Sequence, residues 1–197
     1  MEFTVKLADA QSRVIVEKGC HTRIKDYISH SGRVMVITDV NIPRSLKDTV
    51  LEQFDGALLA EVPQGEDAKS FQVYGTLLEK LLDNGFSRKD MIIALGGGVV
   101  GDLAGFVAGT YKRGCRLLSI PTTTLSQIDS SIGGKVAINM NGIKNCVGTF
   151  YHPEAVLVDT ETLRTLETRH FYNGLVEALK AGCIRDAELF DIFRNHA

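Results

Sequence analysis

The sequence predicts an α/β fold, in which a parallel sheet carries helices on both faces and is followed by the start of an α-helical region. Three observations support this fold class. Short, almost entirely apolar runs alternate with stretches of helical periodicity, as is typical of parallel strands covered on both sides. A glycine-rich turn joins one of these runs directly to a helical stretch. After residue 159 the patterning is helical throughout.

The first elements are two β-rich runs in quick succession, at residues 3–7 and 13–16, which predict a hairpin or an edge pair. Five further apolar runs predict the parallel strands, at residues 33–38, 57–62, 91–95, 116–120 and 155–159. The clearest helix lies between two of them, at residues 71–82, and its apolar face consists of Phe71, Tyr74, Leu77, Leu78, Leu81 and Leu82.

Residues 160–196 are rich in Glu, Leu and Ala and contain no β-branched run. We therefore expect two regions, an α/β domain over residues 1–164 and the first helices of an α-helical domain over residues 165–197. A helix pair with half of its apolar surface unpaired is an incomplete domain. The pattern thus predicts a truncated second domain that self-associates or is disordered near the C-terminus.

The chain has 197 residues and a net charge of −2, and its 22 basic residues are scattered among 24 acidic ones. Nucleic-acid binders gather Lys and Arg into stripes, so no nucleic-acid partner is expected. The sequence has neither a secretory signal nor an apolar stretch of membrane-spanning length, and a cytoplasmic protein without a membrane partner is expected. Four widely spaced cysteines without a Cys-x-x-Cys pair indicate reduced thiols.

The strongest local feature is the run from Gly96 to Asp102, directly after an apolar run and directly before a helical stretch. Glycines there let the backbone approach a pyrophosphate, and the helix N-terminus supplies free amides, which favours a Rossmann-like dinucleotide site. The acidic residue that usually follows about 20 positions later is missing, because the next strand ends in Thr122, Thr123 and Thr124. A tight turn without a ligand is the alternative.

Polar residues follow two more of the apolar runs, at the sheet edge where α/β proteins bind their ligands. Asp39 and Asn41 come after the run at residues 33–38, and either holds ribose hydroxyls or caps the next helix ahead of Pro43. Glu66 and Lys69 follow the run at residues 57–62 and precede a helix. A Glu at this place is also explained without a ligand, because a negative charge near a helix N-terminus interacts favourably with the helix dipole.

Residues 120–145 carry many polar groups and little apolar surface to order them. The stretch contains three consecutive threonines, Asp129, Lys135, Lys144 and Asn145, with a Gly133-Gly134 pair. Such a segment is either a flexible loop or the lining of a polar site. Hydroxyls, a carboxylate and two ammonium groups suit a polyhydroxylated, anionic substrate.

Four ordered blocks resemble the signature blocks of 3-dehydroquinate synthases: GGGVVGDLAGFVAGTYKRG, IPTTTLSQIDSSIGGKVAIN, GIKNCVGTFYHP and NGLVEALKAG. The likeness covers residues 34–182 in order and with the family's spacing. Several blocks in one order are far more specific than a single glycine pattern. The resemblance implies the N-terminal, NAD-binding part of such an enzyme, with the C-terminal helical half absent.

The resemblance also implies roles for individual residues. Positions that contact NAD in the family correspond to Asp39, Asn41, Glu66, Lys69, Gly97, Gly98, Asp102, Thr122 and Thr123, with Lys144 as a further binding position. Asp129 and Lys135 match residues at the junction of cofactor and substrate, Asn145 matches a further binding position, and Lys180 matches a substrate lysine. Arg113 resembles an arginine that reaches the substrate phosphate of a neighbouring subunit, which implies a homodimer. Glu177 matches the carboxylate ligand of a catalytic zinc or cobalt ion. From the residues alone, without the resemblance, Glu177 and Lys180 would be interpreted as an ordinary surface ion pair on one helical face.

The implied reaction is that of a carbon-oxygen lyase acting on a sugar phosphate in the shikimate pathway, the route to aromatic amino acids. NAD removes a hydride from the heptulosonate 7-phosphate with help from the metal, phosphate is eliminated, the hydride returns, and the ring closes to 3-dehydroquinate. Zinc needs three protein ligands and Glu177 is one, so we expect this chain alone to bind zinc weakly and to be inactive. His170 stands where the family pattern has Glu.

Three other functions are compatible with parts of the pattern. A related sugar-phosphate cyclase, of the inosose or valiolone synthase type, would use NAD and a metal ion in the same way. A metal-dependent polyol dehydrogenase has a similar nucleotide domain, but the residues around Asp129, Lys135, Lys144 and Asn145 argue against it. A nucleotide-binding module without catalysis is the third alternative.

Overall fold

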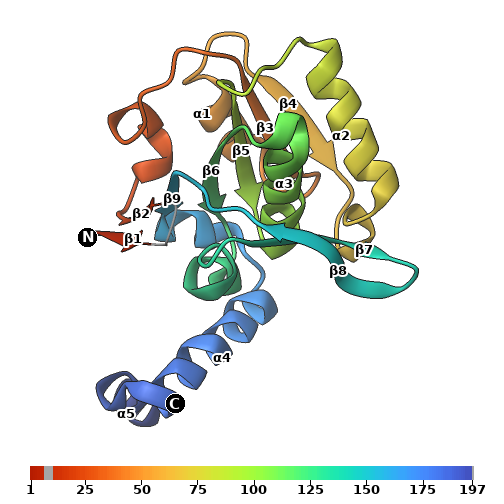
Figure 1. Cartoon of the computed structure of the whole chain (residues 1–197). Helices are drawn as coiled ribbons and strands as arrows, with labels where there is room; N and C mark the ends of the chain where they lie inside the picture. Colours follow the sequence, from red (N-terminus) through yellow and green to blue (C-terminus); the bar gives the residue numbers. More distant parts are fainter. Residues whose placement is uncertain (7–10, 197) are drawn as a thin grey trace.

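The protein is built on a seven-stranded sheet, which the computed structural model describes for residues 1–6 and 11–196 (Figure 1). The strand order is β1-β2-β9-β6-β5-β3-β4, and all neighbours are parallel except β1 and β2. The strands are β1 (Glu2–Lys6), β2 (Gln11–Val16), β3 (Val34–Asp39), β4 (Leu58–Val62), β5 (Met91–Gly96), β6 (Arg116–Pro121) and β9 (Ala155–Val158). The α/β prediction and the antiparallel edge pair are confirmed, with strand ends shifted by a residue or two; Leu7 lies outside the described residues.

Helices cover both faces of this sheet, as the apolar runs predicted. They are α1 (Arg44–Leu51), α2 (Phe71–Asp83) and α3 (Gly98–Thr110). The predicted helix at residues 71–82 is α2, which begins after Ser70, whose hydroxyl accepts a hydrogen bond from the Val73 amide. In Figure 1, α3 lies in front of the sheet beside α2, and α1 lies behind it.

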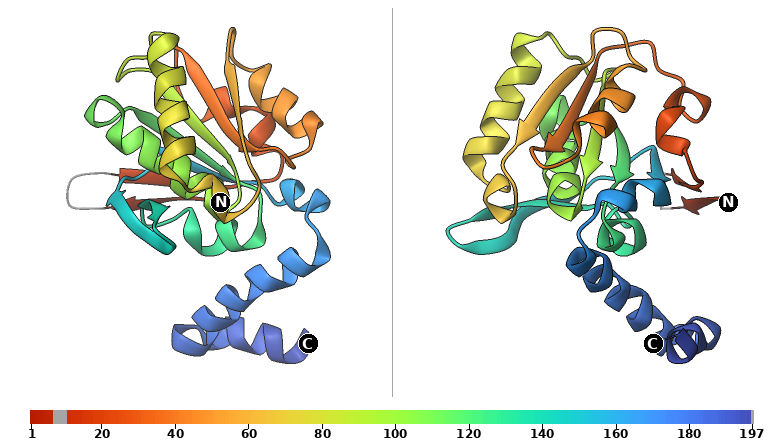
Figure 2. Two further views of the ribbon diagram at one scale, coloured as in Figure 1. Left: turned by 90° about the vertical axis from the view of Figure 1, so that its right-hand side faces the viewer. Right: turned by 180° about the vertical axis from the view of Figure 1, so that it is seen from behind.

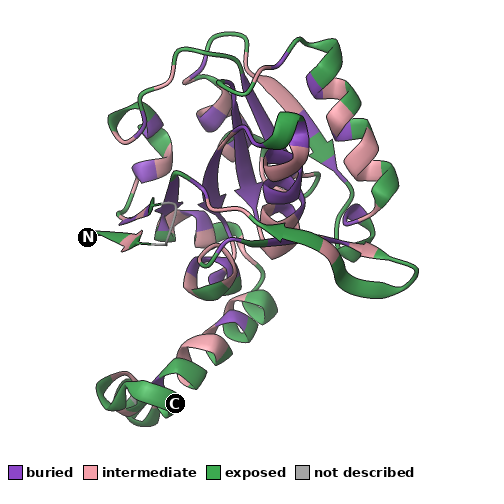
Figure 3. Cartoon of the chain, viewed as in Figure 1, coloured by how far each residue is buried: buried purple, intermediate pink, exposed green. Residues whose placement is uncertain are grey.

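The two faces of the sheet form two separate apolar cores, because successive strand residues point to opposite sides. On β3, Met35 and Ile37 pack in the cluster that includes α2 and α3, whereas Val34 and Val36 pack in the cluster that includes α1. All four are at most 2% exposed, and the strands are the most buried part of the molecule (Figure 3). Each such side chain stabilises the fold by about 1.5–3 kcal/mol.

A β-hairpin forms part of the polar stretch, where the sequence pattern predicted no strand. The strands β7 (Lys135–Met140) and β8 (Ile143–Phe150) pair antiparallel and form a second, two-stranded sheet. Asn141 and Gly142 make the turn with φ values of 50° and 77°, the left-handed conformations that two-residue hairpin turns require. Val136 and Ile138 on β7 are buried in the same cluster as α3, so the hairpin is seated on that helix.

The chain ends in two helices, α4 (Thr168–Arg185) and α5 (Ala187–His196), after the short helix η6 (Thr160–Thr165). They extend away from the sheet in all three views (Figures 1 and 2). The helical prediction for residues 160–196 is confirmed. Large apolar side chains on these helices are exposed, including Val176, Ile184 and Ile192, while the domain boundary at residue 165 and the expected self-association stay predictions.

The four cysteines are free thiols, two buried and two exposed. Burial raises the pKa values of Cys20 and Cys115 to about 12, so these two thiols are poor nucleophiles at neutral pH. In the described part of the chain, every helix is too short or too polar to cross a lipid bilayer.

Asp159 joins the end of β9 to η6 and to the N-terminal region. Its carboxylate is 0% exposed; one oxygen lies 2.5 Å from His21 Nδ1, and the other accepts a hydrogen bond of 2.9 Å from the Glu161 amide. Burial raises the pKa of this carboxyl, but the hydrogen bonds, first that from His21, outweigh burial and lower it below its usual value. Because Asp159 caps η6, the sheet ends one residue earlier than predicted.

This lowered pKa gives an expected pH dependence of stability. An acid whose pKa is lower in the folded chain adds stability above its unfolded pKa of about 3.9, and that stability is lost as the pH falls through the folded pKa. We expect Asp159→Asn to cost about 2 kcal/mol of unfolding free energy at pH 7 and progressively less toward pH 3. Urea unfolding of both chains at several pH values measures this; an equal loss at all pH values contradicts it.

Candidate functional site

The candidate site lies at the carboxyl ends of β3, β5 and β6. From β3 the chain first moves outward to β4 and then returns to β5 on the other side of β3, so the order of the strands reverses between β3 and β5. Thr38 pairs with Leu95, and Gly96 pairs with Pro121, which brings Asp39, Gly97 and Thr122 to one sheet edge. Such a switch point is where open α/β sheets bind ligands.

The glycine turn forms a close-fitting entrance to α3. A Cβ atom on Gly97 would lie 3.0 Å from Thr123 Cγ2, and one on Gly98 would lie 3.0 Å from Ser130 Oγ. Among the described residues, no side chain caps α3, so the first amides of the helix and the positive end of its dipole are available to an anion. A larger residue at either position would therefore crowd its neighbour, which explains the two glycines. The free amides allow the turn to accept a phosphate.

The threonines after β6 have different surroundings. Thr122 is 4% exposed, and its hydroxyl finds no hydrogen-bond partner within the described ranges. Thr123 accepts a hydrogen bond from the Ser126 amide through its Oγ1 and so caps the next turn. A buried hydroxyl without a partner costs free energy, which makes Thr122 a candidate ligand contact, whereas Thr123 already has a structural role.

Asp39 and Asn41 do not cap α1, which corrects one of the two readings of these residues. The helix begins at Arg44 after Pro43, and its N-terminus has no side-chain cap among the residues described. Instead, Asp39 Oδ1 accepts a hydrogen bond of 2.7 Å from the Asn41 amide, and this turn leaves Asn41 exposed. Both side chains thus remain at the carboxyl end of β3, beside the glycine turn.

A buried ion pair connects three elements of the site. Lys69 is 2% exposed, its ammonium lies 2.6 Å from Asp102 Oδ2 on α3, and it also donates to Asn145 Oδ1 on β8. Burial raises the pKa of Asp102, and the hydrogen bond from Lys69 offsets part of that effect. The pair therefore holds α3, the hairpin and the segment after β4 in one arrangement.

A second set of hydrogen bonds fixes the hairpin beside Lys69. Asn139 donates to Glu66 Oε2 at 2.8 Å and accepts from the Asn145 amide at 2.9 Å. Lys144 is exposed, with its ammonium 3.9 Å from Glu66 Oε1. Asn145 has a φ of 55°, a conformation that non-glycine residues adopt mainly where their surroundings enforce it. Asn139 was not expected at the site; the Asn141-Gly142 turn signal would have placed it on a hairpin strand, but its contact with Glu66 depends on how the hairpin docks.

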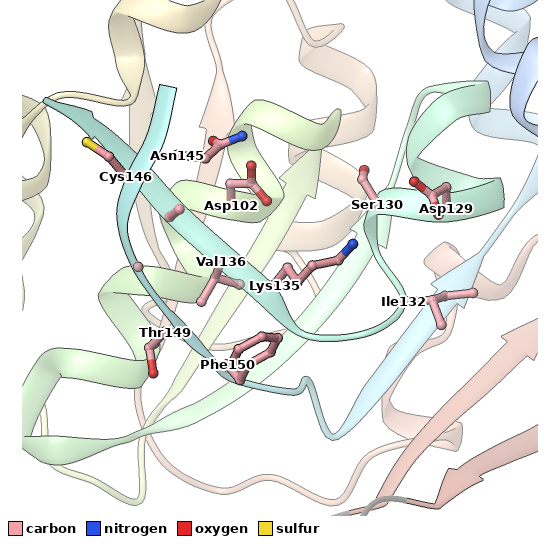
Figure 4. A pocket seen from close by; sticks show the side chains of 12 residues that line it. Asp102, Asp129, Ser130, Ile132, Lys135, Val136, Asn145, Cys146, Thr149 and Phe150 are labelled. Carbon is pink, nitrogen blue, oxygen red and sulfur yellow. The ribbon is translucent and has the colours of Figure 1, made fainter. Parts of the chain in front are cut away.

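The hairpin, α3 and the turn η5 (Ser126–Ser130) enclose a pocket of about 520 Å³. Its walls carry Asp102, Asp129, Ser130, Lys135 and Asn145. Figure 4 shows the Lys135 ammonium pointing between the carboxylates of Asp102 and Asp129. The polar stretch thus lines a pocket, whose mixture of carboxylate, ammonium and amide suits a polar, charged small molecule. That it binds a ligand stays a prediction.

Helix α4 packs against η5, the element that carries Asp129. A Cβ on Gly174 would lie 2.3 Å from the Leu125 amide nitrogen, so the glycine allows α4 to cross directly over η5. Lys180 forms a hydrogen bond to Glu177 that raises the lysine pKa, and the charge of Asp129 adds to the effect. Glu177 and Lys180 therefore form the predicted ion pair, with Asp129 nearby.

Glu177 is not part of a metal site within the described residues. They contain no group of three His, Cys, Asp or Glu side chains that could hold a metal ion, and catalytic zinc takes three protein ligands. His170 is exposed on α4, and the His152 ring packs against Gly134. The residues present do not fit a zinc or cobalt ion by themselves.

Arg113 lies apart from the other candidate residues. It follows α3 in the short helix η4 (Tyr111–Arg113) and precedes β6, so it is at the amino edge of the sheet, with a φ of 65°. Every other candidate lies at the carboxyl edge or on the hairpin and α4. Arg113 is not among the residues that line the pocket of its own chain, and its role in a neighbouring subunit stays a prediction.

Comparisons with known proteins show the family to which this chain belongs. The family model described as 3-dehydroquinate synthase N-terminal matches residues 59–173. The chain is 38% identical to the 3-dehydroquinate synthase of Clostridium beijerinckii over 98% of its own length, and it spans 57% of that relative. Two solved structures are each 29% identical to this chain. The structure of 2-epi-5-epi-valiolone synthase from Streptomyces hygroscopicus, with NAD+ and Zn2+ bound, has a TM-score of 0.85, and the match covers 98% of this chain and 55% of that one. The structure of 2-deoxy-scyllo-inosose synthase, complexed with carbaglucose-6-phosphate, NAD+ and Co2+, has a TM-score of 0.84, and the match covers 91% of this chain and 50% of that one.

Proposed function

Because the chain belongs to the 3-dehydroquinate synthase family, we propose that it forms the NAD-binding part of such an enzyme and one wall of its substrate pocket. The observation that carries the proposal is the meeting of Asp39, the Gly97-Gly98 turn and Thr122 at the switch point of the sheet. The chain spans little more than half of the relative's length, so the activity proposed is that of the whole enzyme, a lyase that makes 3-dehydroquinate from 3-deoxy-arabino-heptulosonate 7-phosphate.

The residues present fit a dinucleotide. The glycine turn and the uncapped start of α3 would hold the pyrophosphate, Asp39 and Asn41 would hold ribose hydroxyls, and the buried Thr122 hydroxyl would gain a partner. Glu66, Lys69, Asp102, Thr123 and Lys144 complete the proposed contacts. When bound, NAD accepts a hydride and returns it later, so the reaction involves no net oxidation.

The pocket residues have roles that follow from their charges. Lys135 and Lys180 would stabilise the anionic substrate and the charge that develops as phosphate leaves. Asp129 would accept hydrogen bonds from substrate hydroxyls and keep the two ammonium groups oriented, and Asn145 would donate through its amide. Arg113 would contribute to the phosphate site of a second copy in a homodimer. Of the proposed metal donors the described residues supply Glu177 alone, so these roles are assigned without a metal.

A sugar-phosphate cyclase of the inosose or valiolone type is the second candidate, because the solved structures of such enzymes superpose with TM-scores of 0.84 and 0.85. The two candidates differ in the phosphorylated sugar that they accept, and the substrate therefore distinguishes them.

The test is phosphate release by this chain mixed with the purified C-terminal part of the Clostridium beijerinckii relative, in the presence of NAD and Zn2+. We expect release from the heptulosonate 7-phosphate by the mixture, none by this chain alone, and a loss of at least about a hundredfold in Lys135→Met. Release from a hexose phosphate instead supports the second candidate. No release, while the full-length relative is active in the same assay, contradicts the proposal.

A further inference from the structure

Ser130 has a buried hydroxyl that the fold itself does not satisfy. Its Oγ atom is inaccessible to solvent and lacks a hydrogen-bond partner within the described part of the chain. The neighbouring residues of the same turn behave differently, since the Ser126 hydroxyl donates to Thr123 O at 2.9 Å and the buried Gln127 amide donates to Asp159 O at 2.8 Å. A buried hydroxyl without a partner costs free energy, and such groups in folded proteins call for an explanation.

The position of this hydroxyl points to a ligand. Ser130 Oγ lies 3.0 Å from the place of a Cβ on Gly98, the first residue of α3, whose N-terminus has no side-chain cap among the described residues. The residue lines the 520 Å³ pocket as well as a cavity of about 20 Å³. Figure 4 shows its side chain between those of Asp102 and Asp129, on the side of the pocket toward which the Lys135 ammonium points.

The surrounding groups decide what the hydroxyl can bind. The amides of α3 and the Lys135 ammonium attract an anion, whereas the carboxylates of Asp102 and Asp129 cannot donate to one. A serine hydroxyl is the neutral donor in this position. A phosphate oxygen seated on the helix N-terminus is thus the acceptor that satisfies Ser130.

We propose that Ser130 is a cofactor-binding residue, whose hydroxyl donates a hydrogen bond to the pyrophosphate of the dinucleotide at the N-terminus of α3. This inference rests on the proposed function, and it adds a contact from the turn that also carries Asp129. The same turn then touches the cofactor through Ser130 and the substrate side of the pocket through Asp129.

The test is calorimetric titration of the wild-type chain and of Ser130→Ala with NAD and, separately, with ADP-ribose, which keeps the pyrophosphate and lacks nicotinamide. We expect Ser130→Ala to bind both ligands about tenfold more weakly, the effect of one hydrogen bond to a charged group. The melting temperature of the ligand-free variant should be equal to or higher than that of the wild type, because the unsatisfied hydroxyl is removed.

Ser131→Ala is the matched control. The Ser131 hydroxyl is also buried without a partner among the described residues. Ser130 and Ser131 both line a cavity of about 20 Å³, large enough for one water molecule, but of the two only Ser130 also lines the 520 Å³ pocket. We expect its affinity for both ligands to equal that of the wild type.

Three results would overturn the inference. A lower melting temperature of ligand-free Ser130→Ala with unchanged affinity means that the hydroxyl serves the fold, through a water molecule for example. Weaker binding of NAD with unchanged binding of ADP-ribose places the contact at the nicotinamide end. Absence of NAD binding by the wild-type chain contradicts the proposed function itself, and with it the role of Ser130.

Discussion

Replacing Lys69 by Met is expected to lower the free energy of unfolding by about 3 kcal/mol and to weaken NAD binding at least tenfold. The Lys69 side chain is 2% exposed, and its ammonium donates hydrogen bonds to Asp102 and Asn145. Without it, a largely buried carboxylate loses its counter-charge, and β8 loses its bond to the segment after β4. Urea denaturation and calorimetric titration with NAD measure the two effects.

The double variant Lys69→Met/Asp102→Asn separates charge from packing. An uncharged amide no longer needs the ammonium, so we expect the double variant to recover at least half of the lost stability. Binding should stay weak, because both residues lie at the proposed cofactor site. If Lys69→Met alone is as stable as the wild type, the ion pair does not hold the site together as described.

Gly105→Val is expected to cost about 2–3 kcal/mol of stability and to weaken NAD binding roughly tenfold. Gly105 is buried on α3, and a Cβ there would lie 2.3 Å from Val136 Cγ1 on β7. The larger side chain must push the hairpin off the helix. Because Lys135 and Asn145 are on that hairpin, the pocket changes shape with it, and denaturation and titration report both consequences.

Gly101→Ala on the same helix is the control for stability. A Cβ on Gly101 meets nothing within 4 Å, so we expect a gain of about 0.5–1 kcal/mol from the higher helix propensity of Ala. Val136→Ala, added to Gly105→Val, should restore part of the lost stability by making room. A Gly105→Val chain with unchanged stability and affinity would show that the seat of the hairpin on α3 does not shape the site.

The sheet and its helices could be predicted because their signal is local. Each parallel strand is an apolar run, and the face of α2 repeats with the helical period, so β3 to β6, β9 and α2 were found to within a residue or two. The hairpin was missed because β8 is exposed along almost all of its length and its apolar residues do not alternate with polar ones as in a half-buried strand. The Asn141-Gly142 pair was the available signal, since such pairs mark two-residue hairpin turns.

The candidate site was predictable in part for the same reason. Polar residues after buried strands meet at one sheet edge in any parallel sheet, which is why Asp39, Gly97 and Thr122 were identified together. The partnership of Lys69 with Asp102 and Asn145 depends on how the hairpin docks, a long-range property that spacing does not encode. Ser130 carried no pattern of its own, because the lack of a partner for its hydroxyl is a property of the folded chain.

The most direct test of a dinucleotide site at the β3–β5 switch point is calorimetric titration of this chain with NAD, beside the variant Gly98→Val. We expect saturable binding of one NAD per chain, and at least about a tenfold loss of affinity in Gly98→Val, because a side chain there fills the place where a phosphate meets the helix amides. Absence of saturable binding at millimolar NAD, or equal binding by both chains, would contradict a cofactor site at this sheet edge.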